Sequence, residues 1–331
     1  MNYKLIKQLS EAFGPSGFED EVKDIIKHEL SGLEFFEDRY GNLIFYKPGK
    51  SNSKKILLEA HIDEIGFMVY SKSNGYIKVA PIGGWDPKVL ISHLIKIKTS
   101  YGFVYGVFSS IPPHLGKISF EISEVEKLIV DVGENYENVE VGDVGVIDYG
   151  FREISENLII GKAFDNRIGT YILIELAKSV NNYYDTYFAF CIEEEVGHRG
   201  ARALVENLNF NVAIIVETTS GESPYLSKEE QSSYISKGPV ITIADKGIIV
   251  KPSFLKEIIS LFKKCEIPYQ IKRPFISSTD AGVINTKALS IVISVPARYI
   301  HTPIQIVHKN DIKLTYKFLK KFLEDKLMFL P

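Results

Sequence analysis

Along the first 65 residues, apolar residues occur first at the spacing of a helix and then in short continuous runs. Four apolar residues share one helical stripe near the start: Leu5, Ile6, Leu9 and Phe13. This spacing predicts a helix that stops at Gly14-Pro15. The stretch Ser16–Glu19 has the form of a capping box, so we expect it to open a second helix. The runs NLIFYK and KKILLEAHID (54–63) then predict strands, and the apolar centre of the second predicts a central strand.

The pattern changes from about Gly66 to Ile159. Short β-rich runs alternate with turns there, and Ser73-Asn74-Gly75 is a hairpin signal. After Gly161, strands and helices alternate again. We expect helices over 166–179, 200–208, 253–264 and 311–327, with strands over 186–192, 212–217 and 289–295. A βα chain interrupted by an all-β stretch predicts an α/β sheet domain with an inserted small barrel.

Composition and charge restrict the class of protein. The 331 residues are 45% hydrophobic and 24% charged, with a net charge of −3, which is typical of a globular protein without a nucleic-acid or membrane partner. No membrane-length apolar run and no signal-peptide pattern occurs, so we expect a cytoplasmic protein. The two cysteines, Cys191 and Cys265, are interpreted as buried small hydrophobes.

Polar residues that suit metal chemistry follow several predicted strands. In His61-Ile62-Asp63, the aspartate can orient the histidine, although a surface histidine is an alternative interpretation. Asp165 stands between a strand and a helix, where it could also be a simple N-cap. Glu193–Glu195 could be an exposed acidic strand end. The remaining candidates, also at strand ends, are Glu217 and His301.

The distribution of these residues is more informative than any one of them. Five successive strand ends each present a histidine or a carboxylate, and such ends share one edge of a parallel sheet. Histidines with carboxylates suit Zn²⁺, Co²⁺ or Mn²⁺. Two divalent cations sharing one carboxylate would balance the repulsion among three consecutive glutamates.

The ordered motifs EAHIDEIGFMV, GKAFDNRIG, EEEVGHRGA, VETT, GPVITIAD, SSTDAG and PARYIHT resemble those of the M42 metallo-aminopeptidases, some of which carry an older glucanase label. The resemblance implies a zinc-peptidase, phosphorylase/hydrolase-like mixed sheet sandwiched by helices. It implies a catalytic domain over 1–66 and 159–331 and an inserted PDZ-like β-barrel dimerisation domain over 67–158. It also implies self-association to a dimer and to a hollow dodecamer that admits short peptides.

The same resemblance implies roles for individual residues. His61, Asp165 and Glu217 would hold one metal ion, and Asp165 would bridge to a second held by Glu195 and His301. Zn²⁺ is the expected metal, with Co²⁺ or Mn²⁺ as alternatives. Three further features are implied: Glu194 as the general base, Asp63 as the support of His61, and a cis Asp165-Asn166 bond. Glu193, where glutamine is usual, is interpreted as lying outside the metal ligands.

The implied reaction is removal of N-terminal residues through a dinuclear, metal-activated water. Three further residues are predicted to contact the substrate: Thr279, Asp280 and Arg298. Alternatives remain open at this point: an endo-1,4-beta-glucanase-type glycosidase, which needs two carboxylates but no histidine pair, a catalytically silent assembly protein, and a related carboxypeptidase or deacylase.

Overall fold

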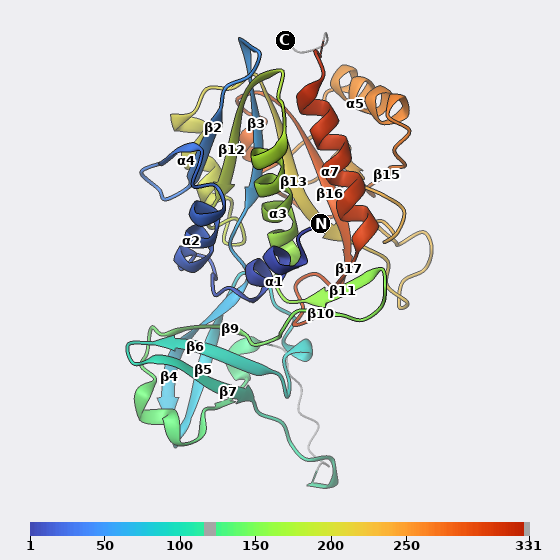
Figure 1. Cartoon of the computed structure of the whole chain (residues 1–331). Helices are drawn as coiled ribbons and strands as arrows, with labels where there is room; N and C mark the ends of the chain where they lie inside the picture. Colours follow the sequence, from blue (N-terminus) through green and yellow to red (C-terminus); the bar gives the residue numbers. More distant parts are fainter. Residues whose placement is uncertain (116–123, 328–331) are drawn as a thin grey trace.

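The computed structural model describes residues 1–115 and 124–327, so part of the predicted insertion lies outside the described residues. Its larger part is built on one mixed sheet (Figure 1). The strands of this sheet are β1 (Glu34–Glu37), β2 (Leu43–Lys47), β3 (Ser51–His61), β10 (Arg152–Glu153), β11 (Leu158–Gly161), β12 (Tyr184–Cys191), β13 (Val212–Ser220), β14 (Val240–Thr242), β15 (Gln270–Ile271), β16 (Leu289–Arg298) and β17 (Gln305–His308). They follow the order β1-β2-β12-β3-β13-β16-β17-β11-β10, and off this path β14 pairs with β16 and β15 pairs with β14.

Four central strands, β12, β3, β13 and β16, run parallel to one another. Their apolar residues are buried because helices cover both faces of the sheet. The helices are α1 (Tyr3–Glu11), α2 (Asp20–Glu29), α3 (Phe164–Ser179), α4 (Arg199–Asn207), α5 (Pro252–Lys264), α6 (Ala281–Ile284) and α7 (Lys309–Glu324). Helices α1, α3 and α7 pack together on the face seen in Figure 1, while α4 and α6 contact each other on the other face. The predicted mixed sheet sandwiched by helices is confirmed.

The start of α2 differs from the expectation. The N-cap of this helix is Glu19, not Ser16. The hydroxyl of Ser16 instead donates a hydrogen bond of 2.6 Å to the Asp63 carboxylate, while Glu19 accepts one from the backbone N–H of Gly17. The predicted capping box is therefore wrong, because a buried tertiary partner takes the serine hydroxyl that the local pattern assigned to the helix.

The inserted stretch contains a closed antiparallel barrel, as predicted. Its strands are β4 (Gly66–Ser73), β5 (Tyr76–Ile82), β6 (Leu94–Thr99), β7 (Gly102–Phe108), β8 (Val130–Asp131) and β9 (Val144–Ile147), in the order β4-β5-β8-β7-β6-β9. The barrel has its own core around Phe67 and Phe108. It lies beyond the end of the main sheet at which β3 leads into β4 (Figure 1). Asn74 and Gly75, with φ of 52° and 81°, form the predicted hairpin turn.

Some expectations about the whole chain are only partly met or stay predictions. Strand β10 belongs to the main sheet although it lies inside the predicted insertion 67–158, and the domain bounds stay a prediction. Cys191 is fully buried as expected, whereas Cys265 is only half-buried. Among the described residues, none of the helices combines the length and apolar character that a membrane crossing needs.

Candidate metal centre

One edge of the main sheet collects the residues predicted to carry chemistry. His61 is the last residue of β3, Glu217 lies near the end of β13, and His301 follows β16. Strand β11 runs antiparallel to β17, which runs antiparallel to β16, so β11 also ends at this edge, and Asp165 follows it. Glu195 comes four residues after the end of β12. The strand directions thus bring together segments that are up to 240 positions apart in the sequence.

The first group of possible metal ligands consists of His61, Asp165 and Glu217. The Nε2 atom of His61 lies 3.6 Å from Asp165 Oδ1 and 3.6 Å from Glu217 Oε2. All three side chains are at least nine-tenths buried. The other oxygen of Glu217, Oε1, is buried and has no hydrogen-bond partner among the described residues. Such an unsatisfied carboxylate oxygen is costly unless a cation or a water binds it.

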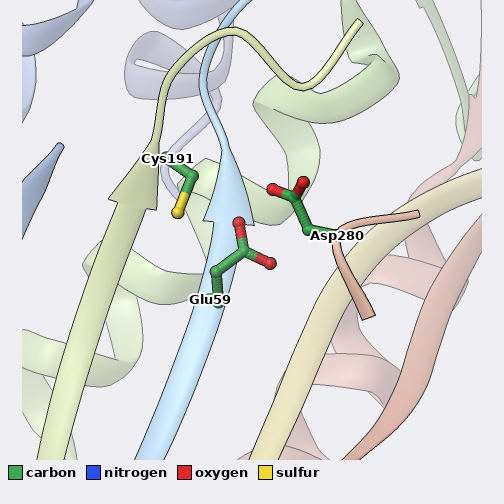
Figure 2. A group of neighbouring side chains, drawn as sticks. All are labelled: Glu59, Cys191 and Asp280. Atoms are coloured by element: carbon green, nitrogen blue, oxygen red, sulfur yellow. The ribbon is translucent and has the colours of Figure 1, made fainter. Parts of the chain in front are cut away.

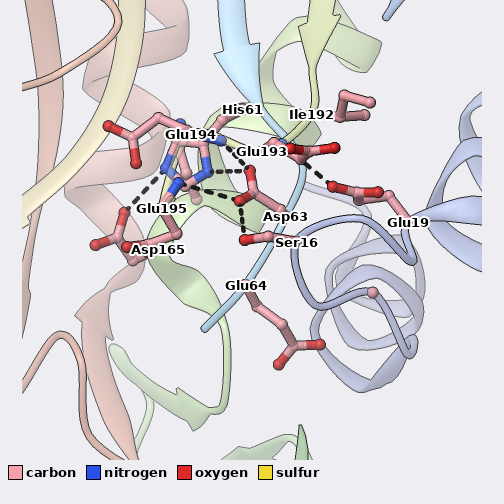
Figure 3. A network of polar contacts seen from close by, with 12 residues as sticks. Ser16, Glu19, His61, Asp63, Glu64, Asp165, Ile192, Glu193, Glu194 and Glu195 are labelled. Carbon is pink, nitrogen blue, oxygen red and sulfur yellow. Dashed lines mark hydrogen bonds and ion pairs between the residues drawn. The ribbon is translucent and has the colours of Figure 1, made fainter. Parts of the chain in front are cut away.

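The second group consists of Asp165, Glu195 and His301. The Nε2 atom of His301 lies 3.5 Å from Asp165 Oδ2 and 3.3 Å from Glu195 Oε1. Asp165 therefore presents Oδ1 to one histidine and Oδ2 to the other, so a single carboxylate belongs to both groups. Figure 3 shows Asp165, Glu195 and His61 converging on the same space.

The backbone around Asp165 is held by bonds that leave its side chain free. Its N–H donates to Gln305 Oε1 at 2.9 Å, and the Asp165-Asn166 peptide bond is cis, as the resemblance implied. Asn166 donates to the carbonyl of Val216 at 2.8 Å. Asp165 and Asn166 have non-helical φ and ψ within α3, and it is the Asn166 side chain that accepts a hydrogen bond from the Gly169 N–H, at 3.1 Å. The N-cap alternative for Asp165 is therefore wrong.

Asp63 fixes both His61 and the chain that carries the glutamates. Its Oδ1 lies 3.3 Å from Nδ1 of His61 and accepts a hydrogen bond from the Glu194 N–H at 3.0 Å. Its Oδ2 accepts from the Glu195 N–H at 3.1 Å and from Ser16 at 2.6 Å (Figure 3). One buried carboxylate thus sets the positions of a histidine and of two consecutive glutamates.

The three consecutive glutamates separate in space. Glu193, with a φ of 53°, has its carboxylate bound to the Tyr40 hydroxyl at 2.9 Å and to Arg199 at 3.0 Å. The Glu194 carboxylate lies 3.2 Å from Nε2 of His198. The Glu195 carboxylate faces His301. The turn after β12 therefore gives each glutamate a different basic partner, and Glu193 lies outside the two candidate ligand groups.

Burial and like charge shift the ionisation of these groups. Burial, opposed by His301 and reinforced by neighbouring carboxylates, raises the pKa of Glu195 to about 7. Burial has the same effect on Glu217, whose pKa is also about 7. For His301, burial alone would lower the pKa, but hydrogen bonds to Asp165 and Glu195 outweigh it and raise the pKa to about 11. This crowding of acids around two histidines is the environment expected of a cation site.

The donor set fits divalent metal ions. Each group offers one imidazole and two carboxylates, which Zn²⁺, Co²⁺ and Mn²⁺ accept as ligands. The aspartate behind His61 is the usual outer-shell partner of a metal-bound histidine. The unpartnered Oε1 of Glu217 is a further oxygen ready for a cation. The residues present therefore fit a pair of metal ions that share Asp165.

The centre opens into a cleft of about 620 Å³. Of the predicted substrate contacts, Thr279 lines this cleft. Asp280 is fully buried below it, and Arg298 pairs with Glu222. Their roles in substrate binding stay predictions. The cleft wall also includes Lys272, which is only 5% exposed and which the sequence pattern did not single out.

A second buried charge network was also not foreseen. The Glu64 carboxylate accepts hydrogen bonds from Lys162 Nζ at 2.6 and 2.8 Å and lies 3.4 Å from Arg167. Arg167 also donates to the carbonyl of Leu9 at 2.7 Å. These bonds tie the segment after β3 to the start of α3, next to Asp165. Their partners are far apart in the sequence, so no local spacing could reveal them.

The role of Asp63 gives a first prediction. In an Asp63→Asn variant, the amide cannot accept hydrogen bonds at both former oxygen positions, so His61 and the Glu194–Glu195 backbone lose their shared support. We expect metal affinity to fall about 10- to 100-fold. Competition with a chelator measures this change, and Asp86→Asn, an exposed position beside the barrel, is the control. Unchanged affinity in Asp63→Asn would refute this positioning role.

The comparisons with known proteins agree with this geometry. The family model for the M42 glutamyl aminopeptidases matches residues 41–318. A lysyl aminopeptidase of Pyrococcus furiosus is 32% identical over 98% of this chain and 97% of its own. The TET aminopeptidase structure from a marine-sediment thaumarchaeon has a TM-score of 0.93 and is 30% identical, covering 98% and 96% of the two chains.

Two other solved structures carry names that bear on function. The TET1 peptidase of Pyrococcus horikoshii, described as assembling into a tetrahedron or a large octahedral shell, has a TM-score of 0.88 at 26% identity, covering 98% of this chain and 99% of that one. A Thermotoga maritima protein called an endoglucanase has a TM-score of 0.80 at 34% identity, covering 96% of each chain. The chain belongs to the M42 peptidase family. This membership supports an aminopeptidase, a hydrolase of peptide bonds.

Proposed function

We propose that the protein is a dinuclear metallo-aminopeptidase that removes N-terminal residues from short peptides. One observation carries the proposal: Asp165 turns one oxygen to His61 and the other to His301, so one carboxylate joins two ligand groups. The groups are His61, Asp165 and Glu217 for one ion, and Asp165, Glu195 and His301 for the other. Zn²⁺ is the proposed metal, with Co²⁺ or Mn²⁺ as substitutes.

A bound metal pair would supply Lewis acidity, which polarises a carbonyl and lowers the pKa of water. Glu194 performs the proton transfers in this proposal. Its carboxylate lines the cleft beside His61 and Glu195, and it is not a ligand in either of the groups that share Asp165. Glu194 accepts the proton of the attacking water and donates it to the leaving amine. The acidic surroundings attract the free α-amino group, which restricts cleavage to the N-terminus.

The cleft also suggests which N-terminal side chain is preferred. Lys272 Nζ donates to Ser277 Oγ at 2.7 Å, and no ion pair joins Lys272 to a carboxylate within the described part of the chain. Burial lowers the pKa of Lys272. The carboxylates of Glu217, Asp245 and Asp165 oppose this shift but make no direct ion pair with Lys272. A buried ammonium group that lines a cleft without a direct ion pair is suited to bind an anion. We therefore propose a preference for peptides with an N-terminal glutamate or aspartate.

This preference gives a second prediction. Lys272→Met is expected to lower kcat/KM for a glutamyl substrate roughly 10- to 100-fold, the value of one hydrogen bond to a charged group. The rate with a leucyl substrate should change little. Aminoacyl chromogenic substrates measure both rates, and Lys237→Met, at an exposed position outside the cleft lining, is the control. Equal losses with glutamyl and leucyl substrates would contradict the proposed specificity.

We also propose that the barrel mediates self-association into a dimer and a dodecamer. Large apolar side chains on its surface are exposed, among them Tyr101 at 79%, Tyr105 at 53% and Leu94 at 51%. Leu94 and Tyr105 lie on the paired strands β6 and β7, and neighbouring exposed apolar side chains of this kind are typical of an interaction surface. The proposal is supported by the TET1 peptidase of Pyrococcus horikoshii, which is described as assembling into a tetrahedron or a large octahedral shell. Light scattering after size-exclusion chromatography tests it, and a monomer at micromolar concentration would contradict it.

The glycosidase alternative has one observation in its favour, the endoglucanase name of a structural relative. A glycosidase needs two carboxylates flanking a sugar and no pair of histidines. The test compares an aminoacyl substrate with a soluble cellulose derivative, with and without chelator. The proposal predicts chelator-sensitive hydrolysis of the aminoacyl substrate only. Chelator-resistant cleavage of the cellulose derivative would support the glycosidase, and no activity on either would support a silent assembly protein.

A further inference from the structure

A third group of possible ligands lies beneath the candidate metal centre. It consists of Glu59 on β3, Cys191 at the end of β12, and Asp280 directly before α6. Figure 2 shows the thiol and the two carboxyl groups pointing toward one another. All three residues are 0% exposed. The group contains none of the residues assigned above to the metal pair.

The position of the group follows from strand geometry. Glu59 precedes His61 by two residues on β3, so both side chains point to the same face of the sheet, about 6.5–7 Å apart along the strand. Cys191 is the residue of β12 paired with His61. Asp280 reaches the group from the segment after Thr279, which lines the cleft. Three segments distant in sequence thus converge on one enclosed point.

The two carboxyl groups lack the partners that buried acids require. Both oxygens of Glu59 and both oxygens of Asp280 are buried, and among the described residues none has a hydrogen-bond partner outside the group itself. The contrast with Glu64 is informative, because this other buried carboxylate is neutralised by Lys162 and lies beside Arg167. An uncompensated buried pair of acids is unfavourable, so either protons or a cation must neutralise Glu59 and Asp280.

We propose that Glu59, Cys191 and Asp280 bind a third divalent cation, of a type that accepts thiolate ligands, such as Zn²⁺. Their candidate ligand atoms all lie within 4.8 Å of one another. Tetrahedral zinc with bonds of about 2.0–2.3 Å places its ligand atoms roughly 3.3–3.8 Å apart, so side-chain movements of about an ångström close the group on an ion. Binding deprotonates the Cys191 thiol, and solvent takes up that proton.

A route for the ion to the site is present. Asp280 also belongs to a second set of neighbouring side chains, with Glu194 and His198, and both of these line the cleft. Glu194 and His198 could therefore bind an ion that enters the cleft and transfer it to Asp280. Once bound, it would connect β3, β12 and the segment before α6, which makes it a structural ion below the catalytic pair.

The decisive experiment uses the Cys265→Ser variant, in which Cys191 is the only remaining cysteine, since the chain has two. The metal-free variant is titrated with Co²⁺ and followed by absorption spectroscopy. The proposal predicts a thiolate-to-cobalt charge-transfer band in the near ultraviolet, together with three ions per subunit by metal analysis. Absence of the band, with two ions or fewer, would overturn it, and protons would then neutralise Glu59 and Asp280.

Two further variants assign the band to this site. Adding Cys191→Ser to the Cys265→Ser background should abolish the band and reduce the metal content by one ion. Adding His301→Ala should leave the band in place while removing a different ion. The inference therefore stands apart from the proposed function, because the thiolate band reports only this site. A band that disappears with His301→Ala but survives Cys191→Ser would also overturn the assignment.

Discussion

Replacing Glu194 by glutamine is expected to lower kcat about 10²- to 10⁴-fold while leaving the metal content unchanged. Glutamine keeps the size of the side chain but cannot accept the proton of the attacking water. Glu194 lies close to His61 and Glu195 but outside the two proposed ligand groups that share Asp165, so under this assignment its loss should not release an ion. Steady-state kinetics on an aminoacyl substrate, with metal analysis of the same sample, measures both quantities.

Glu193→Gln is the matched control for this variant. It makes the same chemical change at the adjacent position, but the Glu193 carboxylate is bound by Tyr40 and Arg199 outside the ligand groups. We expect nearly unchanged activity in this control. Comparable activity in Glu194→Gln and Glu193→Gln would exclude Glu194 as the general base.

The Asp165→Asn variant is expected to lose both metal ions and essentially all activity. An amide offers only one oxygen, and its NH₂ group would face one of the two cations. Since each candidate group contains Asp165, the substitution weakens both sites together. The fall in affinity should exceed the 10- to 100-fold cost of losing an outer-shell partner. Metal analysis after dialysis, and activity with added Zn²⁺, measure these effects.

His301→Ala is the comparison variant for Asp165→Asn. His301 belongs to one group only, so its removal should release one ion and leave the ion bound by His61 and Glu217. If Asp165→Asn and His301→Ala lost the same single ion, Asp165 would serve one site and would not be shared.

The candidate site was largely predictable because of how parallel sheets are built. The apolar runs that end at His61 and near Glu217 identify central strands, and parallel strands bring their carboxyl ends to one edge. Spacing alone could not show that Asp165 faces both histidines. That required the family resemblance, since Asp165 read locally is an ordinary N-cap.

The features that could not be predicted from the sequence depend on residues that are distant in the chain and become neighbours only on folding. Ser16 looked like a helix cap because its local pattern fits one, but Asp63, 47 residues away, takes its hydroxyl. Lys272 and Glu59 carry no local signal of the roles proposed for them. Their importance comes from burial without a neutralising partner, which only the folded chain reveals.

Anomalous diffraction at the zinc edge from crystals grown with Zn²⁺ tests the central claim most directly. The account predicts two peaks on either side of Asp165, one contacted by His61 and Glu217 and the other by Glu195 and His301. A single peak, or none, at this edge of the sheet in the presence of saturating zinc would contradict it.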